Sequence, residues 1–431
     1  MIKLTNTMKP FHHLAVLFLL TGLTASCHET TENKETIEDG FLTITSNGKS
    51  TFSVFVQPGL NNNATAFIED IRKATGATLA LSTTPGQDDS KEIILGDCRQ
   101  YAEAIKPIKE KLHHGYSVKA SGNKIFIIGT DNAWTTLGME FLCGKIMTKP
   151  EYCSEGTFKI PDTFSHTQDS EDPQLIASLL SRGRTFDLVP VEVGICPREG
   201  DFKVAQGAAS DGEFVYFTMK GNEDSSTHDS DVRIYKYSLS PFEFKGVSET
   251  FNGHHANDMT YDTKNGRILV VHGSGASQNL TAITTKPAMG KPSVITTTLG
   301  IGGLSYNAKR DIYGITQGGS KYQTADASFK LIKNYGRNDN MKSTYTAQGM
   351  GSDDSYVYFP MSPNSNSPEK VNLLVVYDWD GRYVGNLKIP LTIESESMFY
   401  AAGEYYVVFY DKAAALYRVY PGLSYRSQVK S

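Results

Sequence analysis

The stretch HANDMTYDTKNGRILVV, residues 255–271, decides the fold of the C-terminal half. It begins with small and polar residues, passes a polar turn and ends in an apolar strand. Four other stretches follow the same plan, namely AQGAASDGEFVYF (205–217), IGGLSYNAKRDIYGI (301–315), AQGMGSDDSYVYF (347–359) and ESESMFYAAGEYYVVF (394–409). Repeated units with short strands and polar turns indicate an all-β repeat architecture.

Aligning these stretches on their turns makes five positions equivalent, and these are Gln206, Asn257, Gly302, Gln348 and Glu396. The equivalent positions lie 45 to 51 residues apart. A period of this length suits a four-stranded blade, so residues 185–426 are predicted to form an all-β five-bladed propeller. The last repeat leaves no room for a fourth strand. We therefore expect RTFDLVPVEVG, residues 184–194, to close the ring as the outer strand of the fifth blade.

The repeat that contains ANDMTYD (256–262) resembles blade starts of uncharacterised five-bladed propellers of bacterial envelope and secreted proteins, including bacteriocin-type proteins of the helveticin class. Five-bladed propellers also include furanoside-cleaving glycosidases and some lectins. The fold alone therefore does not choose a function.

Residues 38–165 alternate strands and helices, which predicts a small α+β domain. Helical periodicity at 62–75 ends at Gly76, and residues 115–129 read as a hairpin. The stretch GYSVKASGNKIFIIGTDNAWTTLGMEFL (115–142) resembles the small α+β domain that precedes the catalytic barrel of bacterial α-glucuronidases and β-hexosaminidases. This resemblance implies an accessory domain in a carbohydrate-processing setting. No barrel follows here, so no catalytic residue is carried over. Residues 166–184 are expected to be a linker with a short helix.

The N-terminus has the pattern of an export signal. Lys3 and Lys9 precede the apolar run 14–23, which is too short for a permanent membrane span. LTASC, residues 23–27, resembles the lipobox of bacterial lipoproteins, which implies lipidation of Cys27 and a signal peptide over 1–27. Thr24 departs from that pattern, so a plain cleaved signal remains the alternative. Polar residues 28–37 then form a tether. The protein is thus expected in the bacterial cell envelope, attached to the membrane through Cys27.

The equivalent positions should form a polar ring at one mouth of the propeller channel. Because strand residues two apart face the same way, His255 should join Asn257, and Glu394 should join Glu396. Amides, an imidazole and carboxylates around an open mouth favour binding of a glycan or another small polar ligand. The predicted ligand-binding set is Gln206, His255, Asn257, Gly302, Gln348, Glu394 and Glu396. A channel that merely holds ordered water has the same composition.

A glycoside-cleaving enzyme is the first alternative, although the ring has acids from the fifth repeat only and hydrolysis uses two carboxyl groups across the bond. In that case Glu396 would be the acid or base, His255 the proton shuttle and Asp258 the partner. Alternation predicts that Asp258 points away from His255 and Asn257. Repulsion from Glu394 would raise the pKa of Glu396.

The other alternative is a scaffold propeller in an envelope protein complex, which would show a broad apolar patch. A sugar site would instead place an aromatic ring near the polar mouth, and Tyr306, Tyr322 and Tyr400 are the candidates.

The sequence predicts no cofactor. Structural zinc is unexpected because the four cysteines after Cys27 have no CxxC spacing. Asp229 and Asp231 could contribute to a calcium site, but a complete calcium loop needs more ligands. No block of basic residues is present, which argues against nucleic acid as a partner.

Overall fold

A computed structural model of the chain describes residues 40–170, 174–223, 230–273, 276–317, 321–337, 343–410 and 412–424. The predicted signal peptide with Cys27, the tether and Asp229 lie outside the described residues. Within the described residues, no helix combines the length and the apolar composition that a membrane crossing requires.

The first described part is α+β. Its main sheet has the strand order β3-β2-β4-β6-β5-β9, in which β2, β3, β4 and β6 run parallel and the β5 pairings are antiparallel. The strands are β2 (Ser53–Val56), β3 (Ala80–Ser82), β4 (Glu92–Leu95), β5 (His114–Ser121), β6 (Lys124–Gly129) and β9 (Ser165–Ser170). A small sheet is formed by β1 (Phe41–Thr45), β7 (Cys153–Ser154) and β8 (Thr157–Pro161).

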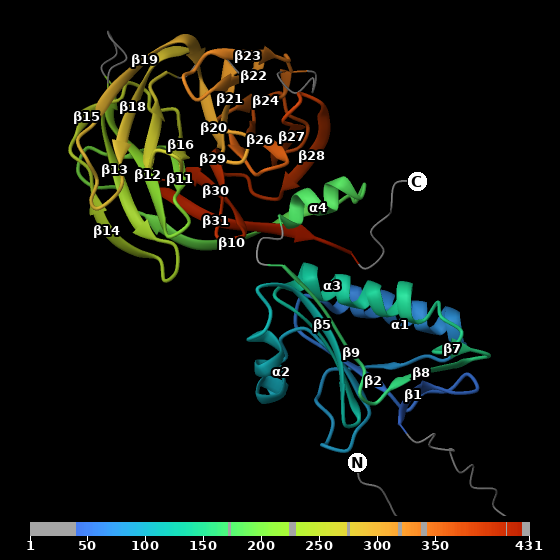
Figure 1. The fold of residues 1–431 in the computed structure, drawn as a ribbon. Helices are drawn as coiled ribbons and strands as arrows, with labels where there is room; N and C mark the ends of the chain where they lie inside the picture. The colour runs from blue at the N-terminus through green and yellow to red at the C-terminus, as the bar shows by residue number, and fades with distance from the viewer. Residues whose placement is uncertain are drawn as a thin grey trace, which may run out of the picture. The chain divides into compact units, whose positions relative to one another are not determined.

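Helices cover both faces of the main sheet (Figure 1). They are α1 (Asn61–Thr75), α2 (Ala102–Lys109) after the 3₁₀ turn η1 (Arg99–Tyr101), and α3 (Asn132–Phe141) with its π-helical continuation η2 (Leu142–Ile146). Alternate residues of β4 divide between two cores. Ile93 packs in the core that includes α1 and α3, whereas Ile94 packs in the core that includes α2. Because β4 is buried on both faces, its apolar residues follow one another without alternation.

Residues 165–170 depart from the predicted linker, because they form the edge strand β9 and pair antiparallel with β5. The pairing uses backbone hydrogen bonds, which polar side chains do not prevent. His166 also stacks on Phe141 at 3.8 Å between ring centroids. The predicted short helix follows as α4 (Leu175–Ser181).

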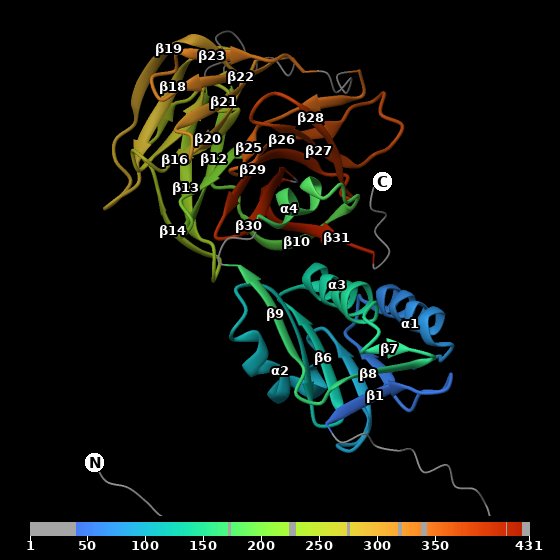
Figure 2. The ribbon, with the colours of Figure 1, turned by 45° about the vertical axis from the view of Figure 1, so that its right-hand side comes forward.

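The second described part, from Asp187 to Gly422, forms five antiparallel sheets within the described residues, and their arrangement is propeller-like (Figure 2). The first sheet contains β11 (Val204–Ser210), β12 (Phe214–Glu223), β13 (Ser230–Ser238), β14 (Glu243–Val247) and β15 (Phe251–Asn252). The second contains β16 (Asp258–Asp262), β17 (Arg267–Val271), β18 (Ser277–Thr284) and β19 (Ser293–Ile301), and the third contains β20 (Gly303–Asn307), β21 (Ile312–Gln317), β22 (Lys321–Asp326) and β23 (Leu331–Asn334). The fourth contains β24 (Tyr345–Ala347), β25 (Gly351–Ser352), β26 (Tyr356–Pro363), β27 (Asn372–Asp378) and β28 (Tyr383–Ile389), and the fifth contains β29 (Glu394–Ala401), β30 (Glu404–Tyr410), β31 (Ala414–Gly422) and β10 (Asp187–Cys196).

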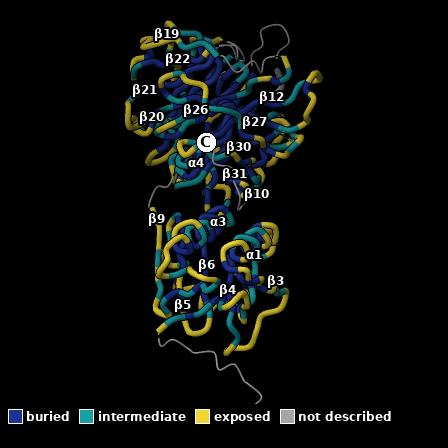
Figure 3. Tube along the Cα trace, turned by 90° about the vertical axis from the view of Figure 1, so that its right-hand side faces the viewer, coloured by how far each residue is buried: buried dark blue, intermediate teal, exposed yellow. Residues whose placement is uncertain are grey.

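The pairing predicted for residues 184–194 is confirmed, since β10 lies antiparallel to β31 with Val189 opposite Tyr420. The first strands of the sheets lie beside one another in the order β11, β16, β20, β25, β29 and back to β11. Figure 3 shows buried chain along β26, β27 and β30 and exposed chain along the outer strand β19. The repeat positions therefore meet at the centre of this part.

Candidate functional site

The first strands are irregular at the repeat positions. In β11 the register shifts between Ala205 and Ala208, and in β29 it shifts between Ser395 and Ser397. His254 and Ala256 both have φ of 51°, so the chain before Asp258 is not a strand. A β-bulge or a left-handed residue changes which way the next side chain points. The predicted alternation of side chains therefore fails at the ring.

Asp258 shows this failure directly, because its carboxylate lies among the first strands of other sheets. It accepts hydrogen bonds from Leu304 N at 2.9 Å, Met350 N at 2.8 Å and Ser397 Oγ at 2.8 Å. Alternation predicted that Asp258 points away from His255 and Asn257, but it did not predict that this carboxylate would contact the first strands of three other sheets. Its side chain is fully buried, and burial raises its pKa to about 7 against the opposing effect of these hydrogen bonds.

Small residues make room for this carboxylate. A Cβ added to Gly349 would lie 2.6 Å from Oδ1 of Asp258, and one added to Gly303 would lie 3.3 Å from Oδ2. Gly207 is equally constrained, because its Cβ would lie 2.7 Å from the carbonyl carbon of Asp258. Asp258 therefore ties the first strands together rather than facing a ligand.

Glu396 is the buried acid of the candidate site, with 5% of its surface exposed. Burial raises its pKa well above the ordinary value, the charge of Glu394 raises it further, and Lys220 opposes both effects. The predicted direction of the Glu394 effect is confirmed. Glu394 itself is exposed, so the bulge at Glu396 gives two acids of one strand different environments.

Lys220 is a site residue that the ring alignment missed. It lies on β12, is 6% exposed, and its Nζ is 3.1 Å from Nδ1 of His255. In the sequence, the feature that could have indicated Lys220 as a site residue is its position as a lone lysine at the end of the apolar stretch FVYFTMK (214–220). The charge of Lys220 also lowers the pKa of Glu396. Lys220 therefore interacts with both His255 and Glu396.

The remaining ring residues are linked by hydrogen bonds. Asn257 Nδ2 donates to Gly302 O at 2.6 Å and to Gln348 O at 3.2 Å. Gln348 Nε2 donates to Glu394 Oε1 at 2.5 Å, and Gln206 Nε2 donates to Ala205 O at 2.8 Å. Asn257 therefore links the chain segments at Gly302 and Gln348, while the Gln348 side chain holds the exposed carboxylate of Glu394 by a hydrogen bond.

The aromatic candidates do not lie at this ring. Tyr306 and Tyr400 line a cavity of about 170 Å³, together with Tyr261 and residues later in the first strands. This cavity is at the opposite end of the first strands from the repeat positions. Tyr322 is fully buried in a different cluster, so its candidacy as an exposed sugar platform was wrong.

Among the residues that the structure describes, no group of three His, Cys, Asp or Glu side chains could hold a metal ion. Asp231 lies in β13, and its predicted partner Asp229 is outside the described residues, so the calcium site stays untested.

No protein-family model matches the chain, and no curated protein matches it. Solved structures with similar folds include three β-propeller-like proteins. Glutaminyl cyclase of Myxococcus xanthus is 12% identical with a TM-score of 0.38, over 55% of this chain and 97% of that one. A GH43 β-1,3-galactosidase is 11% identical with a TM-score of 0.38, over 54% and 61%. A nidogen/laminin complex is 13% identical with a TM-score of 0.30, over 52% and 86%. Because all three TM-scores are below 0.5, these matches carry no argument about this chain.

Proposed function

We propose that residues 185–426 form a closed five-bladed propeller whose ring mouth binds a glycan or a similar small polar ligand. The observation that carries this proposal is Glu396, a buried acid whose pKa is affected by the charges of both Glu394 and Lys220. A buried ionisable group with a perturbed pKa at the end of a channel is typical of a binding site.

The chemistry of these groups matches a polyhydroxylated ligand. Burial raises the pKa of Glu396, which favours a protonated carboxyl that could donate a hydrogen bond, and the carboxyl oxygens of Glu394 could accept one. Gln348 and His255 add an amide and an imidazole at the same mouth. Sugars present adjacent donors and acceptors, and alternating donors and acceptors recognise them.

A glycoside-cleaving enzyme is the second candidate, favoured by the unequal environments of Glu396 and Glu394. A buried carboxyl near an exposed one is the arrangement that acid and base catalysis uses. In this alternative Glu396 supplies the proton and Glu394 acts as the base or nucleophile. Asp258 takes no part, because its carboxylate already accepts hydrogen bonds from three strands.

The test is a glycan panel screened for binding and for cleaved products. Glu396→Gln keeps the size of the side chain but removes the titrating acid, so it should weaken binding and abolish any hydrolysis. Tyr400→Ala is the matched control at the opposite end of the channel and should leave both unchanged. Full binding by Glu396→Gln, or loss of binding in Tyr400→Ala alone, would contradict the proposed site.

We also propose that the mature protein is a lipoprotein of the bacterial envelope, anchored through Cys27. The support is the LTASC stretch after a short apolar run and a positively charged start.

A further inference from the structure

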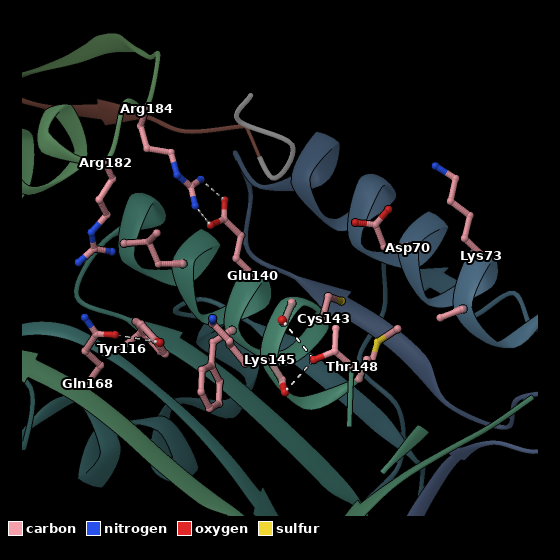
Figure 4. Close-up of a pocket in the computed structure, with 15 residues that line it drawn as sticks. Asp70, Lys73, Tyr116, Glu140, Cys143, Lys145, Thr148, Gln168, Arg182 and Arg184 are labelled. Carbon is pink, nitrogen blue, oxygen red and sulfur yellow. Dashed lines mark hydrogen bonds and ion pairs between the residues drawn. The ribbon is translucent and has the colours of Figure 1, made fainter. Parts of the chain in front are cut away.

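A second cavity, of about 800 Å³, lies in the α+β part (Figure 4). Its walls come from α1, α3, η2 and β5, together with residues that follow α4. None of its lining residues is one of the ring positions, so ligand binding here does not depend on the proposed function.

The turn after α4 places two arginines at this cavity. Gly183 N donates to Leu180 O and Arg184 N donates to Leu179 O, both at 3.0 Å. This hydrogen-bond pattern, with Gly183 at φ of 68°, is the Schellman motif that commonly ends a helix. The side chains of Arg182 and Arg184 both line the cavity as a result.

The two arginines differ in their partners. Arg184 Nη1 donates to Glu140 Oε1 at 2.7 Å and Nη2 donates to Glu140 Oε2 at 2.5 Å, so this pair is neutral as a unit. Arg182 is exposed and makes no side-chain hydrogen bond or ion pair within the described residues. Its charge acts on Tyr116, whose hydroxyl donates to Gln168 Oε1 at 3.1 Å. Figure 4 shows the Arg182 guanidinium directed toward the Tyr116–Gln168 pair.

The same cavity has an apolar wall. Leu137 and Phe141 of α3 and Met147 line it, and Phe141 is held by its stacking on His166. A ligand that fits needs a negative group for Arg182 and an apolar body for this wall. The bidentate Arg184–Glu140 contact shows that a carboxylate suits a guanidinium here.

We propose that this cavity binds a small molecule that carries a carboxylate on a flat apolar ring. The carboxylate pairs with Arg182, and the ring packs against Leu137 and Phe141. Arginine suits this role because its planar guanidinium matches carboxylate geometry.

The test compares benzoate with benzamide, its neutral counterpart, and with inorganic phosphate, by calorimetric titration of the purified full chain. Benzoate should bind more tightly than either, and Arg182→Gln should weaken benzoate binding by about tenfold or more, the scale of a lost charge-assisted hydrogen bond. Arg99→Gln, which removes an exposed arginine on η1 outside the cavity, should leave benzoate binding unchanged.

A second variant tests the geometry from the other side. Glu140→Gln removes the carboxylate that occupies Arg184 and should strengthen benzoate binding. Equal binding of benzoate and benzamide, tighter binding of phosphate, or an unchanged affinity in Arg182→Gln would overturn the proposal.

Discussion

Asp258 is the residue on which the centre of the β-rich part depends most. Its Oδ2 accepts from Leu304 N and Met350 N, and its Oδ1 accepts from Ser397 Oγ. Ser397 Oγ also lies 3.3 Å from Ala208 O, which it can donate to. One carboxylate thus joins strands that lie far apart in the sequence.

Replacing Asp258 with alanine should cost about 3 kcal/mol or more, because two buried N–H groups would lose their acceptor. An asparagine side chain would keep an oxygen for both N–H groups and could donate to Ser397 Oγ, so Asp258→Asn should cost about 1 kcal/mol or less at neutral pH. Urea unfolding of both variants measures this difference. Asp380→Asn, at an exposed carboxylate, is the control and should change little. Equal losses in the alanine and asparagine variants would contradict the role assigned to the hydrogen bonds.

Titration of Asp258 should make the stability of the fold depend on pH. Because burial raises its pKa from 3.8 to about 7, the folded protein binds more protons than the unfolded chain across this window. The free energy of unfolding should therefore fall as the pH rises from about 4 to about 7, by up to about 4 kcal/mol for this group. Glu396 and Glu404 act in the same direction, and burial raises the pKa of Glu404 to about 7. Unfolding measured across this range should therefore show a smaller fall in Asp258→Asn than in the wild type, and an unchanged slope would exclude Asp258 as a source.

At the residue scale, sequence reasoning selected the right stretch but not the direction of its side chains. Three of the five repeat positions are in contact, since Asn257 donates to the backbone oxygens of Gly302 and Gln348. The contacts of Asp258 with other first strands were not predicted, because bulges and left-handed residues interrupt strand alternation. Lys220 was missed because it comes from a second strand, outside the aligned position.

The strands and helices themselves were easier to predict, because the spacing of apolar residues along the sequence follows the period of each element. Helix α1 ends at Gly76, the hairpin of β5 and β6 forms, and β10 pairs with β31 as expected. Strand β9 was missed because its side chains are nearly all exposed and polar. Edge pairing of this kind leaves little trace in hydrophobic periodicity.

The pairing of β10 with β31 can be tested with an engineered disulfide. Val189→Cys combined with Tyr420→Cys places two cysteines at directly paired positions, so they should cross-link under mild oxidation. Because the bond would close a very long loop, it should stabilise the fold by about 2–4 kcal/mol. Gel mobility before and after reduction detects the link, and thermal unfolding measures its effect. Val189→Cys with Arg418→Cys is two residues out of register and should not cross-link. Efficient linking of both pairs would contradict the register.

At the scale of the whole molecule, the anchor makes a separate prediction. Cys27→Ser removes the thiol that lipidation requires, so the variant should leave the membrane fraction of the producing bacterium. Fractionation and mass spectrometry of the mature N-terminus check this. If the wild-type protein lacks a lipid on Cys27 but is still cleaved, the plain signal peptide is the correct interpretation. Neither result affects the proposed channel site.

We propose that a polar ligand binds at the ring mouth beside Glu396 and Glu394. A crystal structure of the protein with the ligand that binds best in the glycan panel tests this most directly. Hydrogen bonds from that ligand to Glu396, Glu394 or Gln348 are expected. A ligand seated against Tyr306 and Tyr400 at the opposite end, or away from the channel altogether, would contradict this proposal.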